Sequence, residues 1–162
     1  MITKRYWKMV SPDRFALYHE DTMVGRMVIQ SHTRQPQAVF ETGTKTYYLS
    51  RSGLLAHQLV IDDTQENRVL KQKGGMFGTD STLILGQRQL HCRIKNTPLA
   101  TFSIFDNDKE LLQYRITSEL VLDIKVAAGE ENYLLDFFLF YNVLPILQEQ
   151  TTFVAFRQSQ AQ

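Results

Sequence analysis

The chain has 162 residues, a length that suits one domain with a sizeable hydrophobic core. Hydrophobic residues make up 43% of the sequence and charged residues 22%, which is ordinary globular composition and excludes a disordered chain. The 18 basic and 17 acidic residues give a formal net charge of +1, which argues against a dedicated nucleic-acid binder.

Cysteine content and the distribution of apolar residues predict the compartment. Cys92 is the only cysteine, so no internal disulfide can form and a reducing compartment is expected. The N-terminus is basic but no apolar run follows it, so a secretory signal is not expected. No run reaches the roughly 18 to 20 apolar residues of a spanning helix. We therefore expect a cytoplasmic protein, free or peripheral to a membrane, with no transmembrane span.

Short apolar-alternating runs separated by turn residues fill the chain from residue 3 to about residue 126 and predict antiparallel strands. The connections between these runs are short, which favours a meander of hairpins. In chain order, strands are predicted at residues 3–10, 14–19, 23–30, 38–42, 45–50, 57–62, 68–73, 81–85, 88–95, 99–105, 111–116 and 119–126. Residues 52–56 are predicted as a helical turn or a loop, and the glycine-rich residues 73–80 as a flexible connection.

The run at residues 88–95 shows the strand pattern most clearly. Leu90, Cys92 and Ile94 share one face, and the residues between them form a polar face. This period-two alternation predicts one buried face and one face in contact with water. Cys92 is therefore expected to be a small buried hydrophobe and not a nucleophile.

The stretch YLLDFFLFYNVLPIL at residues 133–147 is interrupted in its apolar run only by Asp136 and Asn142, and it predicts a helix. A helix that is apolar on every side must be enclosed by protein or by lipid. Its length, Asp136 and Pro145 weigh against a membrane span, and the preceding strands supply enough apolar faces to wrap it.

Both ends of this helix have sequence signals. Glu130 and Glu131 suit a helix N-terminus, where carboxylates are favourable. Pro145 lacks an N–H and crowds the preceding turn, so the helix is predicted to kink or end near Leu144. Residues 151–156 are predicted as a last short strand or an ordered extension.

These elements predict a mainly β fold. We expect a closed antiparallel β-barrel of about twelve strands that encloses one hydrophobic C-terminal α-helix. Residues 1–157 would form a single domain and residues 158–162 a frayed tail. One alternative is a lipocalin-like barrel with fewer strands and an open interior, with the helix packed outside. Another is a pleckstrin-homology-like sandwich with a C-terminal helix, which also needs fewer strands.

Asp136 is the most unusual single residue, because it lies within an apolar helix that is predicted to be buried. A buried carboxylate needs a partner or a proton. It is interpreted either as a polar anchor to backbone N–H groups or to a residue of the barrel wall, or as a group that lines a ligand cavity.

A basic surface is predicted on two of the strands. Lys71 and Lys73 share one face of their strand, and His91, Arg93 and Lys95 share the outward face of theirs. If the two strands are neighbours, these side chains form an anion-binding patch that suits the phosphates of lipid headgroups. The other interpretation is an ordinary solvated sheet face.

Other constellations of catalytic or ligand-binding residues are not found in the sequence. The histidines fall on separate elements without the spacing of metal ligands, at His19, His32, His57 and His91. The glycines at residues 74–78 have neither the lysine nor the following helix of a phosphate-binding loop. No catalytic residue, metal or cofactor is therefore predicted.

The strand layout followed by one hydrophobic helix resembles the tubby C-terminal-like superfamily. That group includes tubby proteins, phospholipid scramblases and the plant LURP-one-related proteins. The resemblance is greatest in the runs LVIDD, RVLKQKGG, TLILG and TFSIFDNDKELLQYRI, together with the helix at residues 133–147. It implies a closed barrel with the helix threaded through its middle. The acidic calcium-binding segment, proline-rich N-terminus and acylated cysteines of scramblases are not found in this sequence, so scramblase activity is not implied.

The resulting expectation is a non-enzymatic binding or scaffold module. Its expected partner is an anionic phospholipid headgroup at a membrane surface, or an unidentified protein, and not a nucleic acid. Tubby proteins bind phosphoinositides through basic residues on the barrel surface, to which the basic residues here are analogous only in type. A carrier of a small hydrophobic ligand is the alternative function, and an enzyme is the least favoured.

Overall fold

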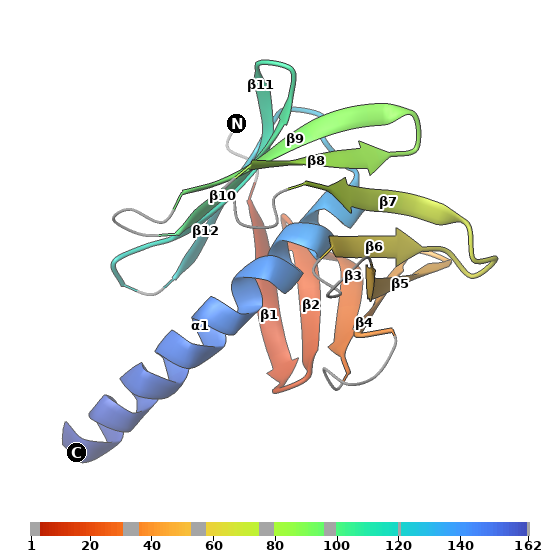
Figure 1. Cartoon of the computed structure of the whole chain (residues 1–162). Coiled ribbons are helices and arrows are strands. Elements are labelled where there is room, and N and C mark those ends of the chain that lie inside the picture. Colours follow the sequence, from red (N-terminus) through yellow and green to blue (C-terminus); the bar gives the residue numbers. More distant parts are fainter. Residues whose placement is uncertain are drawn as a thin grey trace.

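The computed structural model describes residues 4–30, 36–52, 58–74, 80–95, 100–119 and 121–161, with side chains as far as Gln148. In this part of the chain, twelve strands form a single antiparallel sheet and one helix follows them (Figure 1). The strands are β1 Arg5–Ser11, β2 Arg14–His19, β3 Thr22–Ile29, β4 Ala38–Thr42, β5 Lys45–Ser52, β6 Gln58–Asp62, β7 Arg68–Lys73, β8 Asp80–Leu85, β9 Arg88–Lys95, β10 Thr101–Asp106, β11 Lys109–Ile116 and β12 Leu122–Val126. The helix α1 spans Tyr133–Ala161.

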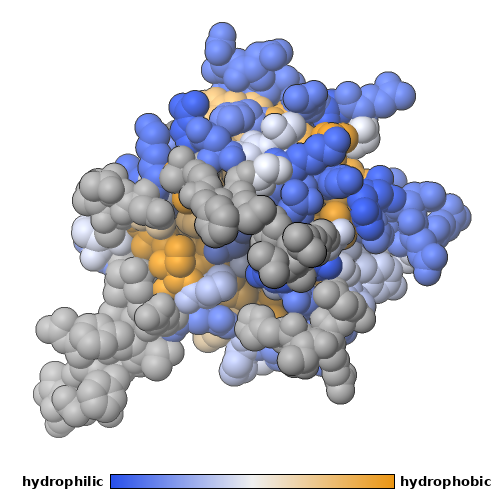
Figure 2. Space-filling view, in the orientation of Figure 1, coloured by the Kyte–Doolittle hydropathy of each residue, from blue (hydrophilic) through white to orange (hydrophobic). Residues whose placement is uncertain are grey.

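The sheet is a pure meander, in which each strand pairs with the next one along the chain. It curls round until its first and last strands, β1 and β12, lie side by side. No hydrogen-bonded ladder joins these two strands among the described residues, so the barrel is nearly closed. In the view of Figure 2 the outer surface is mostly hydrophilic, with a hydrophobic area on its left side.

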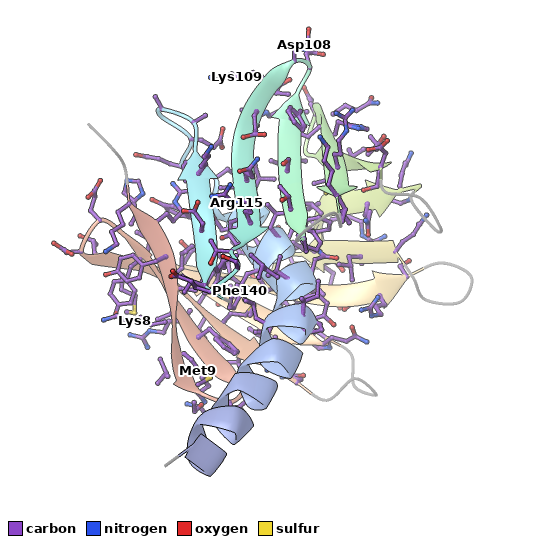
Figure 3. All side chains as sticks on the ribbon, turned by 90° about the vertical axis from the view of Figure 1, so that its left-hand side faces the viewer. Lys8, Met9, Asp108, Lys109, Arg115 and Phe140 are labelled. Carbon is purple, nitrogen blue, oxygen red and sulfur yellow. The ribbon has the colours of Figure 1, made fainter. Side chains whose placement is uncertain are left out.

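The first half of α1 fills the interior of this barrel (Figures 1 and 3). Every residue from Leu134 to Leu144 is buried, except the half-buried Asn142. The Asn142 amide donates a hydrogen bond of 2.7 Å to the Phe138 carbonyl, which satisfies it within the helix. Burial contributes about 1.5–3 kcal/mol for each large apolar side chain. The predicted barrel around a hydrophobic helix is therefore confirmed, with a gap in its pairing at one seam.

Aromatic rings fix the position of the helix inside the barrel. Phe140 of α1 stacks on Trp7 of β1 with ring centroids 4.2 Å apart. The Phe15 and Phe140 rings are T-shaped to each other, with centroids 5.2 Å apart. Phe137 stacks on Phe40 of β4 at 4.9 Å. Because these contacts involve two neighbouring turns of α1, they resist both sliding and rotation of the helix.

The two alternative folds are wrong. A lipocalin-like barrel would keep an open interior and place the helix outside, whereas the side chains of α1 occupy the interior. A pleckstrin-homology-like sandwich would need several of the predicted strands to be loops, whereas twelve strands are found in the described residues.

The predicted end of the helix near Leu144 is also wrong, and so is the alternative of a strand at residues 151–156. The backbone of α1 continues through Pro145 to Ala161. Proline lacks the N–H that would bond to the Tyr141 carbonyl, so the helix continues past this position with one hydrogen bond fewer. The helix begins at Tyr133, where Asn132 Oδ1 accepts a hydrogen bond of 3.2 Å from the Leu134 N–H.

The last strand is shorter than predicted and begins at Leu122 instead of residue 119. The Thr117 N–H donates to the Val121 carbonyl at 2.9 Å, and the Val121 N–H donates to Thr117 Oγ1 at 3.2 Å. These bonds keep Val121 outside β12, which starts at Leu122. The predicted flexible connection and helical turn fall largely on residues 75–79 and 53–57, which lie outside the described residues.

Antiparallel order gives the barrel two distinct ends, because consecutive connections alternate between them. The β2–β3, β4–β5, β6–β7, β8–β9 and β10–β11 connections lie where α1 begins, which we call the entry end. The β1–β2 and β11–β12 connections lie at the opposite end, the exit end, where α1 leaves the barrel (Figure 1).

Gly25 of β3 provides a test of the core packing. A Cβ at this position would lie 2.5 Å from the edge of the Phe40 ring, which stacks on Phe137 of the helix. We expect Gly25→Ala to lower the free energy of unfolding by about 1–3 kcal/mol, measured by urea denaturation, because the ring has to move. In the double variant with Phe40→Leu, the two losses should be less than additive. Strict additivity would contradict this packing.

Candidate functional site

The five residues of the predicted basic patch lie on one outer face of the sheet. Lys71 and Lys73 are on β7, and His91, Arg93 and Lys95 are on β9. The two strands are not direct neighbours, since β8 lies between them. In the sheet register, Lys73 is opposite Thr82 of β8, and Thr82 is opposite His91. Two strand spacings separate Lys73 from His91, about 10 Å.

The strand between them adds a carboxylate that the sequence analysis did not include. Asp80, the first residue of β8, is paired in register with Arg93. Its Oδ1 atom lies 3.3 Å from Arg93 Nε and 3.4 Å from His91 Nε2. The sequence pattern placed Asp80 in a connection, and only the register of β8 against β9 brings it into the patch. Two of the five predicted residues are therefore engaged with an internal anion.

The three lysines of the patch are different. Among the described residues, Lys71, Lys73 and Lys95 form no ion pair. Lys73 and Lys95 are exposed, each at the last position of its strand. The Arg93 guanidinium also lies over the Phe105 ring of β10, 5.6 Å from its centroid. Spaced ammonium groups around a partly neutralised centre can bind a polyanion at several points.

Asp136 belongs to a buried polar network and not to a cavity. Its Oδ2 atom accepts a hydrogen bond of 2.8 Å from Arg5 Nη1, and its Oδ1 atom accepts one of 2.6 Å from the Tyr114 hydroxyl. The Tyr114 oxygen in turn accepts a bond of 2.8 Å from Trp7 Nε1. The side chains of Arg5 and Asp136 are both 0% exposed. These contacts are those of a helix carboxylate anchored to the barrel wall.

Arg5 connects this network to the start of the helix. Its Nη2 atom donates to the Glu130 carbonyl at 2.8 Å and lies 3.3 Å from His19 Nδ1. Its guanidinium also lies over the Tyr133 ring at 4.9 Å. The Arg5 Nε atom is buried without a hydrogen-bond partner. One sequence signal could have identified this partner of Asp136. Arg5 lies two residues before Trp7, so both side chains are on the same, inward face of β1.

Burial governs the protonation of these core groups. It raises the pKa of the Asp136 carboxyl from 3.8 to about 6, and the nearby Arg5 charge opposes that rise. Burial also raises the pKa of the Tyr114 hydroxyl well above its ordinary value, so this group stays a donor. The pKa of the Cys92 thiol is raised to about 12, again by burial, which makes it a poor nucleophile.

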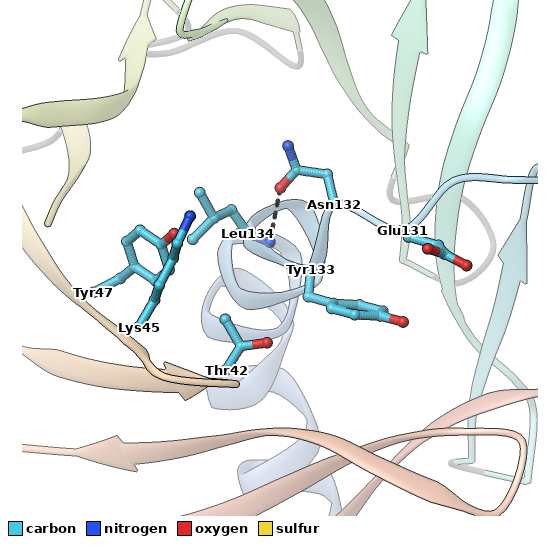
Figure 4. A pocket seen from close by; sticks show the side chains of 7 residues that line it. All are labelled: Thr42, Lys45, Tyr47, Glu131, Asn132, Tyr133 and Leu134. Carbon is cyan, nitrogen blue, oxygen red and sulfur yellow. Dashed lines mark hydrogen bonds between the residues drawn. The ribbon is translucent and has the colours of Figure 1, made fainter.

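A shallow pocket of about 520 Å³ lies at the entry end, where the β4–β5 turn faces the start of α1 (Figure 4). Its lining is mixed in character and comprises Thr42, Lys45, Tyr47, Glu131, Asn132, Tyr133 and Leu134. The Asn132 side chain is occupied in capping the helix. Because this wall combines segments about ninety residues apart, no local sequence pattern indicates the pocket.

Two features are absent from the described part of the chain. No three His, Cys, Asp or Glu side chains there lie close enough together to hold a metal ion. Nor does that part contain a helix long and apolar enough to cross a bilayer. Two of the four histidines, His32 and His57, lie outside the described residues.

Comparisons with protein-family models, with curated proteins and with solved structures find no match to this chain. The resemblance to the tubby C-terminal-like superfamily therefore stays a prediction. The function has to be inferred from the charges, burial and contacts of the residues described above.

The Arg5–Asp136 pair can be tested through its pH dependence. Removing one partner of a buried pair leaves an uncompensated charge, so Arg5→Met should cost about 3–5 kcal/mol of unfolding free energy at about pH 7.5. Without Arg5 the folded-state pKa of Asp136 rises further above 3.8, its ordinary value. A raised folded-state pKa makes stability increase as pH falls through it, so the loss should shrink by about pH 5.

The matched control is the double variant Arg5→Met/Asp136→Asn. It removes both charges, while an amide at position 136 can still accept the Tyr114 hydroxyl proton. Urea denaturation should place this variant closer to the wild type than Arg5→Met at neutral pH, and without its extra pH dependence. A pH-independent loss in Arg5→Met would show that the buried charge is not what destabilises it.

Proposed function

We propose that this chain is a non-enzymatic binding module that recognises anionic phospholipid headgroups at a membrane surface through the outer face of β7 to β9. The observation that carries the proposal is the set of three lysines, Lys71, Lys73 and Lys95, on one sheet face without an ion-pair partner among the described residues. Phosphate groups of headgroups match such spaced ammonium groups.

The spacing of the patch supports a ligand with more than one negative charge. Lys71 and Lys73 lie two residues apart on one face, about 7 Å. His91 lies across β8 from Lys73, on the same row of the register. A single small anion contacts one or two of these groups, whereas a lipid surface or a multiply phosphorylated headgroup contacts several. The patch therefore favours polyanionic lipid over a monovalent ion.

Asp80 gives the patch a built-in competitor. Its bonds to Arg93 and His91 lie on the exposed surface, where an ion pair contributes only about 0–1 kcal/mol. A headgroup phosphate can therefore replace the carboxylate as the partner of Arg93. These contacts would keep Arg93 and His91 bonded in the free protein and still allow exchange at an anionic membrane.

Because the interior of the barrel is filled, a ligand is expected to bind on the outer surface and not inside. The side chains of α1 fill the space in which a lipocalin-like carrier would hold its ligand. Asp136 is fully buried and bonded to Arg5 and Tyr114, so no substrate can reach it. Neither an enclosed ligand cavity nor a site at Asp136 is therefore supported, which leaves the outer surface for binding.

Co-sedimentation with phosphatidylcholine vesicles that do or do not contain a phosphoinositide tests the proposal. We expect binding only to the anionic vesicles, weakened by salt because exposed charges are screened. Lys71→Glu/Lys73→Glu should reduce binding at least about tenfold, since each cation near such a surface contributes about 1 kcal/mol. Asp80→Asn should increase it, because the competing carboxylate is gone.

The control is Lys109→Glu, which reverses an exposed charge at the first residue of β11, at the entry end. It should bind like the wild type. Equal binding to neutral and anionic vesicles, or binding to neither, would disprove the function. Equal losses in Lys71→Glu/Lys73→Glu and Lys109→Glu would show a nonspecific charge effect in place of a patch.

A further inference from the structure

The pocket at the entry end is formed in part by side chains on the inward face of the barrel. Thr42, Lys45 and Tyr47 lie on the same face of the β4–β5 hairpin as Phe40 and Leu49, which are both 0% exposed in the core. All five strand connections of this end, and the start of α1, belong to the described residues. The pocket is therefore a part of the barrel mouth that α1 leaves unfilled, and it opens to solvent.

Lys45 is an unexpected residue on an inward face. It is exposed, and among the described residues it forms no ion pair. Two other basic side chains lie on inward strand faces at this end, and both are paired. Arg5 lies 2.8 Å from Asp136, and Arg88 lies 3.3 Å from Asp106. The Lys45 ammonium group thus lies at the barrel mouth without a counter-ion from the described part of the chain.

The remaining lining supplies apolar surface and a second donor. The rings of Tyr47 and Tyr133 are partly buried, and Leu134 is 8% exposed. Figure 4 shows Tyr47 and Lys45 on one side of the start of α1 and Tyr133 on the other. The Asn132 amide oxygen caps the helix, and no bond joins its NH₂ group to another described residue, so this group is available as a donor.

Glu131 is the acidic residue in the lining. Figure 4 shows it on the opposite side of the helix start from Lys45, with its carboxylate directed away from that lysine. It is exposed, so its charge is screened by water. An anionic group can therefore contact Lys45 without approaching Glu131, although the carboxylate still opposes its binding.

We propose that the entry-end pocket binds a small amphipathic carboxylate. Its anionic group would contact Lys45 and the Asn132 amide, and its apolar body would lie against the rings of Tyr47 and Tyr133. This site goes beyond the proposed headgroup binding on β7 to β9 and does not depend on it.

The size and the donors of the pocket select this class of ligand. Its volume of about 520 Å³ is within the range of small-molecule sites, roughly 300–1,000 Å³. One ammonium group and one amide match the single charge and the two oxygens of a carboxylate. A phosphate dianion would need further cations, and a fully apolar ligand would leave Lys45 without a partner.

A titration with 3-phenylpropionate, followed by amide chemical shifts of the ¹⁵N-labelled protein, tests the site. We expect shifts concentrated at residues 42–47 and 131–134, with a Kd of about 1–5 mM, which is ordinary for a ligand of this size in an open pocket. The uncharged analogue 3-phenylpropionamide should bind about fivefold more weakly, because an exposed charge pair contributes at most about that factor.

Charge variants locate the anionic group. Lys45→Gln should bind 3-phenylpropionate about fivefold more weakly and the amide as the wild type does. The matched control is Lys109→Gln, since Lys109 is also exposed and is also the first residue of a strand at the entry end. It should keep the wild-type affinity. Glu131→Gln should bind the carboxylate about twofold more tightly, because a repulsive charge is removed.

Several results would overturn the site. These are no saturable shifts, equal affinities for the carboxylate and the amide, equal losses in Lys45→Gln and Lys109→Gln, or weaker binding in Glu131→Gln. Matching urea unfolding curves for the three variants would establish that none acts through the fold. Lys45→Gln should still co-sediment with phosphoinositide vesicles like the wild type, so the pocket and the headgroup patch are tested separately.

Discussion

The buried ion pair between Arg5 and Asp136 is the contact on which the rest of the structure depends. Arg5 begins the first strand and Asp136 lies in the first turn of the helix, so 131 residues separate the partners. Tyr114 of β11 bonds to the same carboxylate. The pair thus lies where the first strand, the late strands and the helix meet, beside the seam that lacks a ladder of hydrogen bonds. A polar network with defined geometry gives this hydrophobic interior one register for the helix.

The helix is held at a second point, near the exit end. The Tyr141 hydroxyl donates a hydrogen bond of 2.6 Å to Gln37 Oε1, which also accepts a bond of 3.0 Å from Arg51 Nε. The stacked rings of Phe137 and Phe140 lie between these two polar anchors. With its core thus occupied and fixed, the barrel has its outer wall and its two ends available for binding. These surfaces are where its charges are unevenly distributed.

The difference between the two ends follows from the topology. In a meander of antiparallel strands, every second connection returns to the same end. A sequence can therefore give two different surfaces to one barrel by alternating the chemistry of its turns. The acidic turns Glu20-Asp21 and Asn107-Asp108 fall at the entry end, whereas Val10 and Val121 fall at the exit end, together with Asp13. The basic patch reaches the exit end through Lys73 and Lys95, the last residues of β7 and β9.

Period-two alternation along the chain was enough to determine the strands, because the core lies on one side of each of them. It identified the runs that became β2, β4, β7 and β9 with their observed bounds, and it placed Cys92 inward and Lys73 outward. The almost uniformly apolar helix likewise required enclosure by protein or by lipid. The short connections predicted the meander order, but only the tertiary structure decided the register between neighbouring strands, since register is a property of two segments. It brought Asp80 into the basic patch, paired Arg5 with Asp136, and let α1 continue beyond Pro145, whose exposure no local pattern revealed.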